Sequence, residues 1–383
     1  MEPHLWTAEQ ESARAGFRAF ARRHLEPHAA RFDREERLDE GVFALMASQG
    51  YLGALVPAAH GGRELDPLTF GFLNEEIGAA CSSARSLLTV HGMVCQAIGA
   101  WGTPEQKARW LPELASGRAL GAFALTEPEV GSDARSVQTT ATPDGQGWLL
   151  NGHKKWITFG EVATLLLVLA RHGEQTLALL VDGSAPGVQR TPIRGMLGTR
   201  ASMLAEICFQ DCRVPPGHLL ARAGFGFPVM ASALDLGRFS VAWGCVGLGQ
   251  ACLEASVRHA STRQQFGRPL AGHQLVQRML ADMVVGVRAS RLLCLQAAAA
   301  RAAGHPRSTL DTLLAKYHAS TMAMRAAQDA VQVHGASGCS AEHPVSRYLR
   351  DAKTMEIIEG ASEILQGLIA GQARGDVRPV PEG

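Results

Sequence analysis

Apolar and polar positions over the first third of the chain follow a helical period. Stretches such as DEGVFALMASQGYLGALV (39–56) space their apolar residues three and four positions apart, which is typical of a helix with one buried face. TAEQ at Thr7–Gln10 and TPEQ at Thr103–Gln106 have the Thr-x-x-Gln spacing of a capping box, and Pro104 suits a first helical position. We therefore expect a helical domain over residues 1–118.

The pattern changes near residue 119. Short apolar runs, split by Gly, Asp and Asn, replace the amphipathic stretches: WLLNGHKKWIT (148–158), ATLLLVLA (163–170) and TLALLV (176–181). Runs of this length predict strands, and RHGEQ (171–175) between two of them suits a hairpin turn. VPPGHLL (214–220) reads as a turn near a domain boundary, so we expect a strand-rich middle domain over residues 119–225.

Helical spacing returns from about residue 226. The Ala/Leu-rich segment QLVQRMLADMVVGVRASRLLCLQAAAARAA (274–303) has the apolar spacing of a helix in a bundle. We expect a third, helical domain over residues 226–383. The order helices, strands, helices predicts an α+β multidomain protein that is mostly α.

Composition excludes several classes of partner. The chain is 46% hydrophobic and 19% charged with a net charge of +1, so neither nucleic acid nor an anionic membrane surface is expected as a partner. No apolar run reaches the length that crosses a bilayer, and the N-terminal sequence lacks an apolar signal core, so we expect a cytoplasmic protein. The cysteines are scattered, and Cys208–Cys212 has no second pair at zinc spacing, so no metal site is expected.

The glycine-rich segment GCVGLG (244–249) resembles a dinucleotide-binding loop. That loop needs Gly-x-Gly-x-x-Gly between a strand and a helix, whereas here the spacing is reversed and both flanks are helical in pattern. Tight packing of a helix through small residues is the better interpretation.

Two stretches of the middle domain suit a planar polar ligand. FALTEPEVGSD (123–133) is a polar, Gly-containing loop that can present hydroxyl and backbone N–H groups, although an ordinary turn is the default. KKWITFG (154–160) places Trp156 and Thr158 on one side of a strand, because side chains alternate along a strand with period two. A flat aromatic beside a hydroxyl suits a heteroaromatic ring, and a core Trp with a hydrogen-bonded Thr is an equally good interpretation.

Two stretches of the C-terminal domain suit ligand binding, one by contacting a diphosphate and the other by letting the backbone lie close to the ligand. STRQQFGRPL (261–270) puts Arg263 and Phe266 on one helix face, with Gly267 ending the helix, and the alternative is an exposed Arg beside a core Phe. QVHGASG (332–338) is a glycine turn after a helix, in which His334 is more often a core or turn residue than a catalyst.

Glu359 is a carboxylate where an apolar helical run ends against Gly360. The negative end of a helix dipole and burial beside Ile357 and Ile358 would both raise its pKa. A carboxylate with a raised pKa suits a general base for a carbon acid, and a solvated surface Glu is the alternative.

Taken in order, these motifs resemble the acyl-CoA dehydrogenase flavoprotein family. The match consists of LTEP-x-x-GSD, NG-x-K-x-WIT, R-x-x-FG, Q-x-x-G and RDAK…EG, and it covers nearly the whole chain. The resemblance implies an N-terminal helical domain, a β-barrel-like middle domain and a C-terminal four-helix bundle. It also implies FAD as the cofactor, an acyl thioester as the substrate, an external electron acceptor and a homodimer or homotetramer.

The resemblance also implies roles for individual residues. Glu359 would be the catalytic base, and it is the only candidate, since Gly237 stands where some relatives carry the base. FAD would be bound by Phe123, Leu125, Thr126, Ser132, Trp156, Thr158, Arg263, Phe266, Gln332 and Gly335, of which Arg263, Phe266 and the Gln332–Gly335 turn would reach the FAD of a neighbouring subunit. The substrate would be bound by Arg85, Ser132, Asp235, Arg238 and Gly360.

The sequence departs from many relatives at Glu129, Ala336 and Ala361, the last of which removes a hydroxyl that would face the flavin. CSSARSLLTVHGM, SVAWGCVG and RDAK-x-MEIIEG are most similar to one branch, the acyl-carrier-protein dehydrogenases of polyketide pathways to hydroxymalonyl or methoxymalonyl extender units. Arg85, in an apolar stretch, would then hold an oxygen-rich acyl group. A catabolic acyl-CoA dehydrogenase and a non-catalytic acyl-thioester-binding protein are the alternatives.

Overall fold

The computed structural model describes residues 5–145 and 147–376. Its N-terminal part is helical, and both expected capping boxes are present, with Thr7 accepting from the Gln10 amide and Thr103 accepting from the Gln106 amide. The helices are α1 (Ala8–His24), α2 (Ala29–Glu35), α3 (Glu40–Ser48), α4 (Pro67–Ala80), α5 (Ser82–Trp101) and α6 (Pro104–Ala115). Helices α4 and α5 are buried along most of their length, so they connect this domain to the rest of the protein.

The middle of the chain forms one sheet with the order β6-β7-β3-β2-β4-β5-β8, while β1 pairs in parallel with β4. Its strands are β1 (Gly121–Ala124), β2 (Thr140–Asp144), β3 (Gly147–Ile157), β4 (Leu165–His172), β5 (Gln175–Asp182), β6 (Val188–Pro192), β7 (Ala205–Val214) and β8 (Leu219–Leu220). The expected hairpin is confirmed, because His172 pairs with Gln175 across the β4–β5 turn. All residues of β4 from Leu165 to Ala170 are buried, which is why its sequence is one continuous apolar run.

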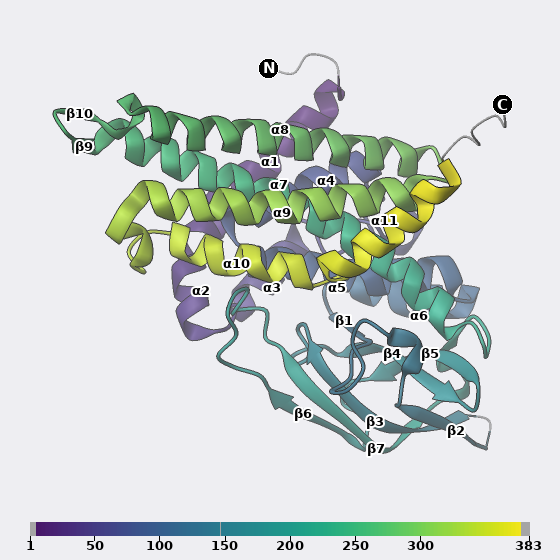
Figure 1. Ribbon diagram of the computed structural model, residues 1–383. Helices are drawn as coiled ribbons and strands as arrows, with labels where there is room; N and C mark the ends of the chain where they lie inside the picture. Colours follow the sequence, from purple (N-terminus) through teal and green to yellow (C-terminus); the bar gives the residue numbers. More distant parts are fainter. Residues whose placement is uncertain (1–4, 146, 377–383) are drawn as a thin grey trace, which may run out of the picture.

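The C-terminal part is a layer of long helices above the sheet (Figure 1). It comprises α7 (Gly226–Thr262), α8 (Gln274–Ala302), α9 (Ser308–His334), α10 (Val345–Ile357) and α11 (Ser362–Asp376), and a small hairpin of β9 (Gln264–Gln265) and β10 (Arg268–Pro269) protrudes between α7 and α8. The expected fold class is therefore confirmed. The domain boundaries stay predictions, and residues 377–383 of the expected third domain lie outside the described residues.

The glycine-rich segment 244–249 lies inside α7, as the packing interpretation requires. A Cβ at Gly247 would lie 1.9 Å from the backbone oxygen of Glu75, so the missing side chain is what lets α4 and α7 approach. The segment is a helix contact and not a dinucleotide loop.

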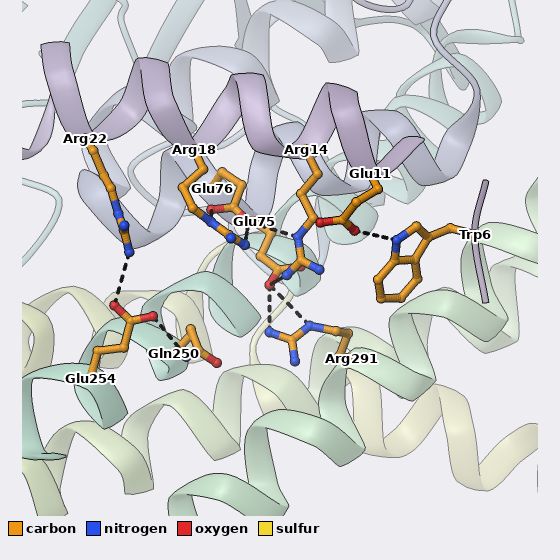
Figure 2. A network of polar contacts seen from close by, with 10 residues as sticks. All are labelled: Trp6, Glu11, Arg14, Arg18, Arg22, Glu75, Glu76, Gln250, Glu254 and Arg291. Carbon is orange, nitrogen blue, oxygen red and sulfur yellow. Dashed lines mark hydrogen bonds and ion pairs between the residues drawn. The ribbon is translucent and has the colours of Figure 1, made fainter. Parts of the chain in front are cut away.

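A buried ion network joins the first and last domains (Figure 2). Arg14 of α1 and Arg291 of α8 both donate to Oε1 of Glu75 on α4, at 2.8 and 2.7 Å, and Arg14 also donates to Glu76. Buried charges are retained only where they are paired, so these contacts fix the relative position of three helices.

Helix α8 is the one helix of the described residues that is long and apolar enough to cross a membrane, a test that a core helix also passes. Less than half of its most apolar window, 44%, is buried here, so a large part of its apolar surface faces outward. All eight cysteines are free, and the described residues contain no cluster of metal-ligating side chains.

Candidate active site

Glu359 lies in the turn between α10 and α11. Its backbone is left-handed, with φ of 55°, and Gly360 follows with φ of 100°. The carboxylate oxygen Oε2 is buried and has no hydrogen-bond partner in the described protein. Ile357 is 58% exposed, so the expectation that Ile357 helps to bury Glu359 is wrong. Ile358 is half-buried and packs against the core, and Gly237 of α7 lies beside the Glu359 carboxylate.

Burial raises the pKa of Glu359, while the cations Arg238, Arg85 and Lys316, in that order, act to lower it. The net direction is upward, as the sequence predicts, and burial is its largest cause. The result is a buried carboxylate with a free oxygen and a pKa above its ordinary value, which suits a general base.

Gly237 of α7 provides the space that the carboxylate occupies. A Cβ at this position would lie 2.5 Å from Glu359 Oε2 and 2.8 Å from the sulfur of Met93. Gly237 therefore leaves the space that the Glu359 carboxylate needs, since a side chain at position 237 would displace that carboxylate.

Two expected substrate-binding residues differ in their availability. Arg238 donates from Nε to the backbone oxygen of Glu359 at 3.0 Å, so it contacts the turn that carries the carboxylate. Asp235 is paired with Arg301 of α8, although its Oδ1 has no partner among the described residues. Contacts of either residue with a substrate stay predictions.

Arg85 of α5 is only 1% exposed, so it is a buried arginine and not a surface one. Its guanidinium donates to the Thr89 hydroxyl at 2.6 Å, to Ser86 at 3.3 Å and to the sulfur of Met355 at 3.2 Å. No ion pair within 4.0 Å joins it to a carboxylate of the described residues, and burial lowers its pKa while Glu359 acts to raise it. A buried arginine held by hydroxyls is free to pair with an anion or an oxygen-rich group.

The polar loop 123–133 is tied to the end of β3 by a buried ion pair. Lys154 Nζ donates to Glu127 Oε1 at 2.7 Å and to the backbone oxygen of Leu125 at 3.0 Å. The carboxylate of Glu127 also accepts from the Gln138 and Thr139 amides. These contacts hold Leu125 and the adjoining Thr126 against the strand that carries Trp156, so the structure brings together two stretches that the sequence singles out.

The alternation argument for Trp156 and Thr158 is wrong. Strand β3 ends at Ile157, and Trp156 has a left-handed φ of 63° where the pairing with β7 shifts register. Trp156 is 46% exposed, which also rules out the interpretation as a core Trp. The irregular backbone, and not a regular pleat, presents the indole at the surface.

The expectation that Arg263 and Phe266 share a helix face is also wrong. Helix α7 ends at Thr262, and Phe266 and Gly267 form the two-residue turn of the β9–β10 hairpin with φ values of 52° and 74°. Two positive φ values are those of a type I′ turn. Phe266 is 95% exposed, so it is not a core residue either.

The ends of α7 and α9 lie together. His259, one turn before Arg263, stacks on His334 with ring centroids 4.3 Å apart, and Gly335 follows with φ of 61° and ψ of −139°, a conformation open essentially only to glycine. The expected glycine turn after a helix is confirmed, and His334 is a buried residue bonded to the Ala330 oxygen. No hydrogen bond or ring contact among the described residues joins this region to loop 123–133.

The residues expected to hold FAD fit a flavin dinucleotide in their chemistry. The hydroxyls of Thr126, Ser132 and Thr158 make no hydrogen bond with the described protein, and the indole of Trp156 is 46% exposed, with the Lys155 ammonium 5.0 Å from its ring centroid. Phe123 is buried and Leu125 half-buried, while Arg263 and Gln332 are exposed and make no side-chain hydrogen bond with the described residues. Free hydroxyls, an exposed indole and an unpaired guanidinium match an isoalloxazine ring and a diphosphate.

Three family models together match most of the chain. They are the N-terminal, middle and C-terminal domains of acyl-CoA dehydrogenase, over residues 7–118, 122–212 and 224–373. The chain belongs to the acyl-CoA dehydrogenase family. It is therefore an FAD-dependent oxidoreductase that acts on CH–CH donors.

Individual members of this family match the chain over nearly their whole length. Probable acyl-CoA dehydrogenase YngJ of Bacillus subtilis is 39% identical over 96% of this chain and 98% of the relative. The structure of a glutaryl-CoA dehydrogenase from Mycobacterium smegmatis in complex with FADH2 has a TM-score of 0.93 and 28% identity, covering 99% of this chain and 98% of that one. FkbI, described as acting in biosynthesis of the methoxymalonyl extender unit of the polyketide Fk520, has a TM-score of 0.86 and 35% identity, covering 94% and 99%.

Several residues of the site escaped the sequence analysis. Lys154, Glu127 and Lys316 are buried and charged, and each contacts a loop of the candidate site. A signal existed for Lys316, because it occupies an apolar position of a helix between the buried residues Thr312 and Ala319. Nothing local in the sequence indicates that Gly237 faces Glu359.

Proposed function

We propose that this enzyme oxidises a short, polar acyl thioester carried on an acyl carrier protein, as in the formation of hydroxymalonyl- or methoxymalonyl-type extender units. Glu359 removes the α-proton of the thioester. Bound FAD supplies the acceptor for the β-hydride at its N5 position. From a glyceryl group, loss of these two hydrogens leaves an enediol that tautomerises to the 3-aldehyde.

The burial and the partners of Arg85 support a substrate with a polar acyl group. Arg85 is buried, its side-chain partners within the described part of the chain are two hydroxyls and a thioether, and Glu359 is one of the charges that it experiences. A desolvated cation favours a substrate that brings a carboxylate or several oxygens, and it disfavours a long apolar chain. A glutaryl-CoA dehydrogenase and FkbI, a protein for biosynthesis of a methoxymalonyl extender unit, are similar to this chain in structure.

The role of Glu359 is supported by its free oxygen, its raised pKa and the room that Gly237 provides. A general base must reach the proton that it removes, and an oxygen without a protein partner is available to do so. Residues Asp235, Arg238 and Gly360 are proposed to contact the thioester and its pantetheine arm.

The enzyme is also proposed to be a homodimer or homotetramer. Phe266 at the tip of the β9–β10 hairpin is almost fully exposed, and Leu275, Val285 and Leu292 of α8 are more than half exposed. An apolar hairpin tip and helix face are typical of a surface covered by another subunit. Arg263 and Phe266 would then reach the neighbouring subunit's FAD.

A catabolic acyl-CoA dehydrogenase is the second candidate function. It is favoured by the name of YngJ, whose identity to this chain is 39%. The two functions differ in the carrier and in the acyl group, while Glu359 has the same task in both. A non-catalytic acyl-thioester-binding protein is not supported, because the family is one of oxidoreductases.

Anaerobic bleaching of the flavin absorbance separates the two candidates. Glyceryl, glutaryl, butyryl and hexanoyl thioesters are compared on CoA and on an acyl carrier protein. The polar, carrier-bound proposal predicts the fastest bleaching with a glyceryl or another oxygen-rich group on the carrier protein. Fastest bleaching with butyryl-CoA or hexanoyl-CoA would favour the catabolic function instead.

Arg85→Met tests the acyl group directly, with Arg85→Lys as the matched variant that keeps the charge. We expect Arg85→Met to lose activity on the oxygen-rich thioesters and to gain activity on butyryl or hexanoyl ones, while Arg85→Lys keeps the wild-type order of preference. An unchanged substrate profile in Arg85→Met would overturn the assignment of Arg85.

A further inference from the structure

Two cations hold the two successive backbone carbonyls that follow the Glu359 side chain. Lys316 of α9 donates from Nζ to the oxygen of Gly360 at 2.8 Å, and Arg238 of α7 donates from Nε to the oxygen of Glu359 at 3.0 Å. Lys316 is 0% exposed, and its ammonium makes no other hydrogen bond with the described residues. The turn that carries the carboxylate is thus anchored from two different helices.

The anchoring acts on the backbone and leaves the carboxylate unbonded. Glu359 and Gly360 both have left-handed φ values, a conformation that is unfavourable for a glutamate unless its surroundings hold it. Oε2 of Glu359 nevertheless has no hydrogen-bond partner among residues 5–145 and 147–376. A fixed turn with a free acid group is the arrangement that positions a base and leaves it able to accept a proton.

Lys316 also acts on Glu359 through its charge. The charged groups that Lys316 experiences are Glu359, Arg238 of α7 and Glu356 of α10, together with the thiol of Cys245 on α7. The Lys316 ammonium acts to lower the pKa of Glu359, alongside Arg238 and Arg85 of α5. Burial lowers the pKa of Lys316 itself to about 8, so the ammonium is charged at neutral pH.

We propose that Lys316 is a positioning residue for Glu359, which holds the turn through the Gly360 carbonyl and, through its charge, favours the ionised form of the carboxylate. This inference rests on the proposed role of Glu359 as the base. A lysine that only satisfied a buried carbonyl would affect stability, whereas this role also predicts a change in the pH dependence of proton removal.

The experiment compares wild type with Lys316→Met, Lys316→Arg and the half-exposed control Lys107→Met. Each variant is purified with its flavin, and anaerobic bleaching is followed from pH 5.5 to 9 with whichever of butyryl-CoA, glutaryl-CoA and a glyceryl acyl carrier protein bleaches wild type fastest. Hydrogen exchange of the segment 353–366 is measured by mass spectrometry without substrate. If Lys316→Met binds less flavin than wild type, Lys316→Gln, which keeps a polar head group, takes its place.

We expect Lys316→Met to slow bleaching at pH 7 by roughly 10-fold to 100-fold, since small misplacements of a reacting group have effects of this size. The acidic side of the curve of bleaching rate against pH should move to higher pH in Lys316→Met, because the pKa of Glu359 rises when a nearby positive charge is lost. Exchange in segment 353–366 should become faster. Lys316→Arg, which keeps a charged donor, should recover most of the rate, and Lys107→Met should match wild type.

Unchanged exchange in segment 353–366 of Lys316→Met would overturn the positioning role, whatever the substrate proves to be. A wild-type rate and a wild-type acidic side of the curve in Lys316→Met, while Glu359→Gln is inactive, would overturn it as well and would leave the assignment of Glu359 intact. Bleaching of Glu359→Gln at the wild-type rate would instead overturn the assignment of Glu359 as the base, and the inference about Lys316 would fall with it.

Discussion

Gly237 and Glu359 lie 122 positions apart in the chain, yet a Cβ on Gly237 would come within 2.5 Å of the Glu359 carboxylate. Contacts below 3.0 Å essentially never occur for a Cβ, so the carboxylate would have to move. The absence of a side chain on α7 therefore determines where the proposed base can sit.

Gly237→Ala should keep its flavin and lose activity. The added methyl group displaces the Glu359 carboxylate, and misplacement of a catalytic group by about 1 Å can reduce the rate on the order of 100-fold. The measurement is anaerobic flavin bleaching by an acyl thioester. Gly92→Ala on α5 is the control, because its Cβ would meet neighbours at an ordinary 3.9 Å. Equal rates for the two variants would show that the contact with Glu359 has no effect.

Arg263→Ala should weaken both FAD retention and the oligomer. The guanidinium is proposed to contact the FAD diphosphate across a subunit interface. Its loss would then remove a charge-assisted contact that stabilises both FAD binding and the association of subunits. Flavin content per chain and mass by light scattering measure the two effects. Arg213→Ala, which removes another exposed arginine, should change neither. Full flavin and wild-type mass in Arg263→Ala would contradict the contact.

Glu127→Gln should destabilise the protein and loosen its flavin. It leaves the Lys154 ammonium buried without its carboxylate, and breaking a buried pair from one side costs about 3–5 kcal/mol in the free energy of unfolding. Adding Lys154→Met removes the second charge, so the double variant should recover part of that loss. Urea unfolding of the three proteins provides the test. A double variant less stable than Glu127→Gln would count against the argument.

Stability should fall on mild acidification because of His91. Burial lowers its pKa to about 4 in the folded protein, where the Gly121 amide donates to Nδ1 at 3.1 Å and Nε2 lies 3.2 Å from the Leu114 oxygen. An unfolded histidine has its ordinary pKa near 6.5, so between these values the unfolded state binds more protons. The stability from neutral His91 is present above pH 6.5 and is lost toward pH 4, by up to about 3 kcal/mol.

The His91→Gln variant isolates this effect, since an amide can replace both hydrogen bonds and does not titrate. The free energy of unfolding in urea is compared at pH 7 and pH 4.5 for both proteins. We expect a smaller loss on acidification in His91→Gln than in wild type. Parallel losses would mean that other groups cause the acid sensitivity.

Local rules determined much of the fold from the sequence. The capping boxes at Thr7 and Thr103 and the turn at 171–175 each depend on a few adjacent residues, and each was predictable. The same rules failed where the backbone takes an uncommon conformation. A left-handed Phe266 turns an expected helix end into a hairpin, and a left-handed Trp156 interrupts the alternation of β3. Neither residue type favours a positive φ, so propensity could not indicate them.

The sequence also indicated some residues of the candidate site and not others. Motifs and the resemblance they carry pointed to Glu359 and Arg85, and the structure places both in buried surroundings. The surroundings themselves could not be predicted, because they arise from long-range packing. Gly237 makes room for the carboxylate from α7, and Lys316 anchors the turn of Glu359 from α9. The helical pattern indicates that Lys316 lies on the buried face, but it does not indicate which group Lys316 contacts.

Glu359→Gln, measured by anaerobic flavin bleaching, tests the catalytic base directly. The substitution keeps the size of the side chain and removes the group that accepts the α-proton. We expect the variant to keep its FAD and bind the thioester while bleaching roughly 100-fold to 10,000-fold more slowly than wild type, the usual loss for a general base. Bleaching of flavin-replete Glu359→Gln at close to the wild-type rate would contradict the assignment.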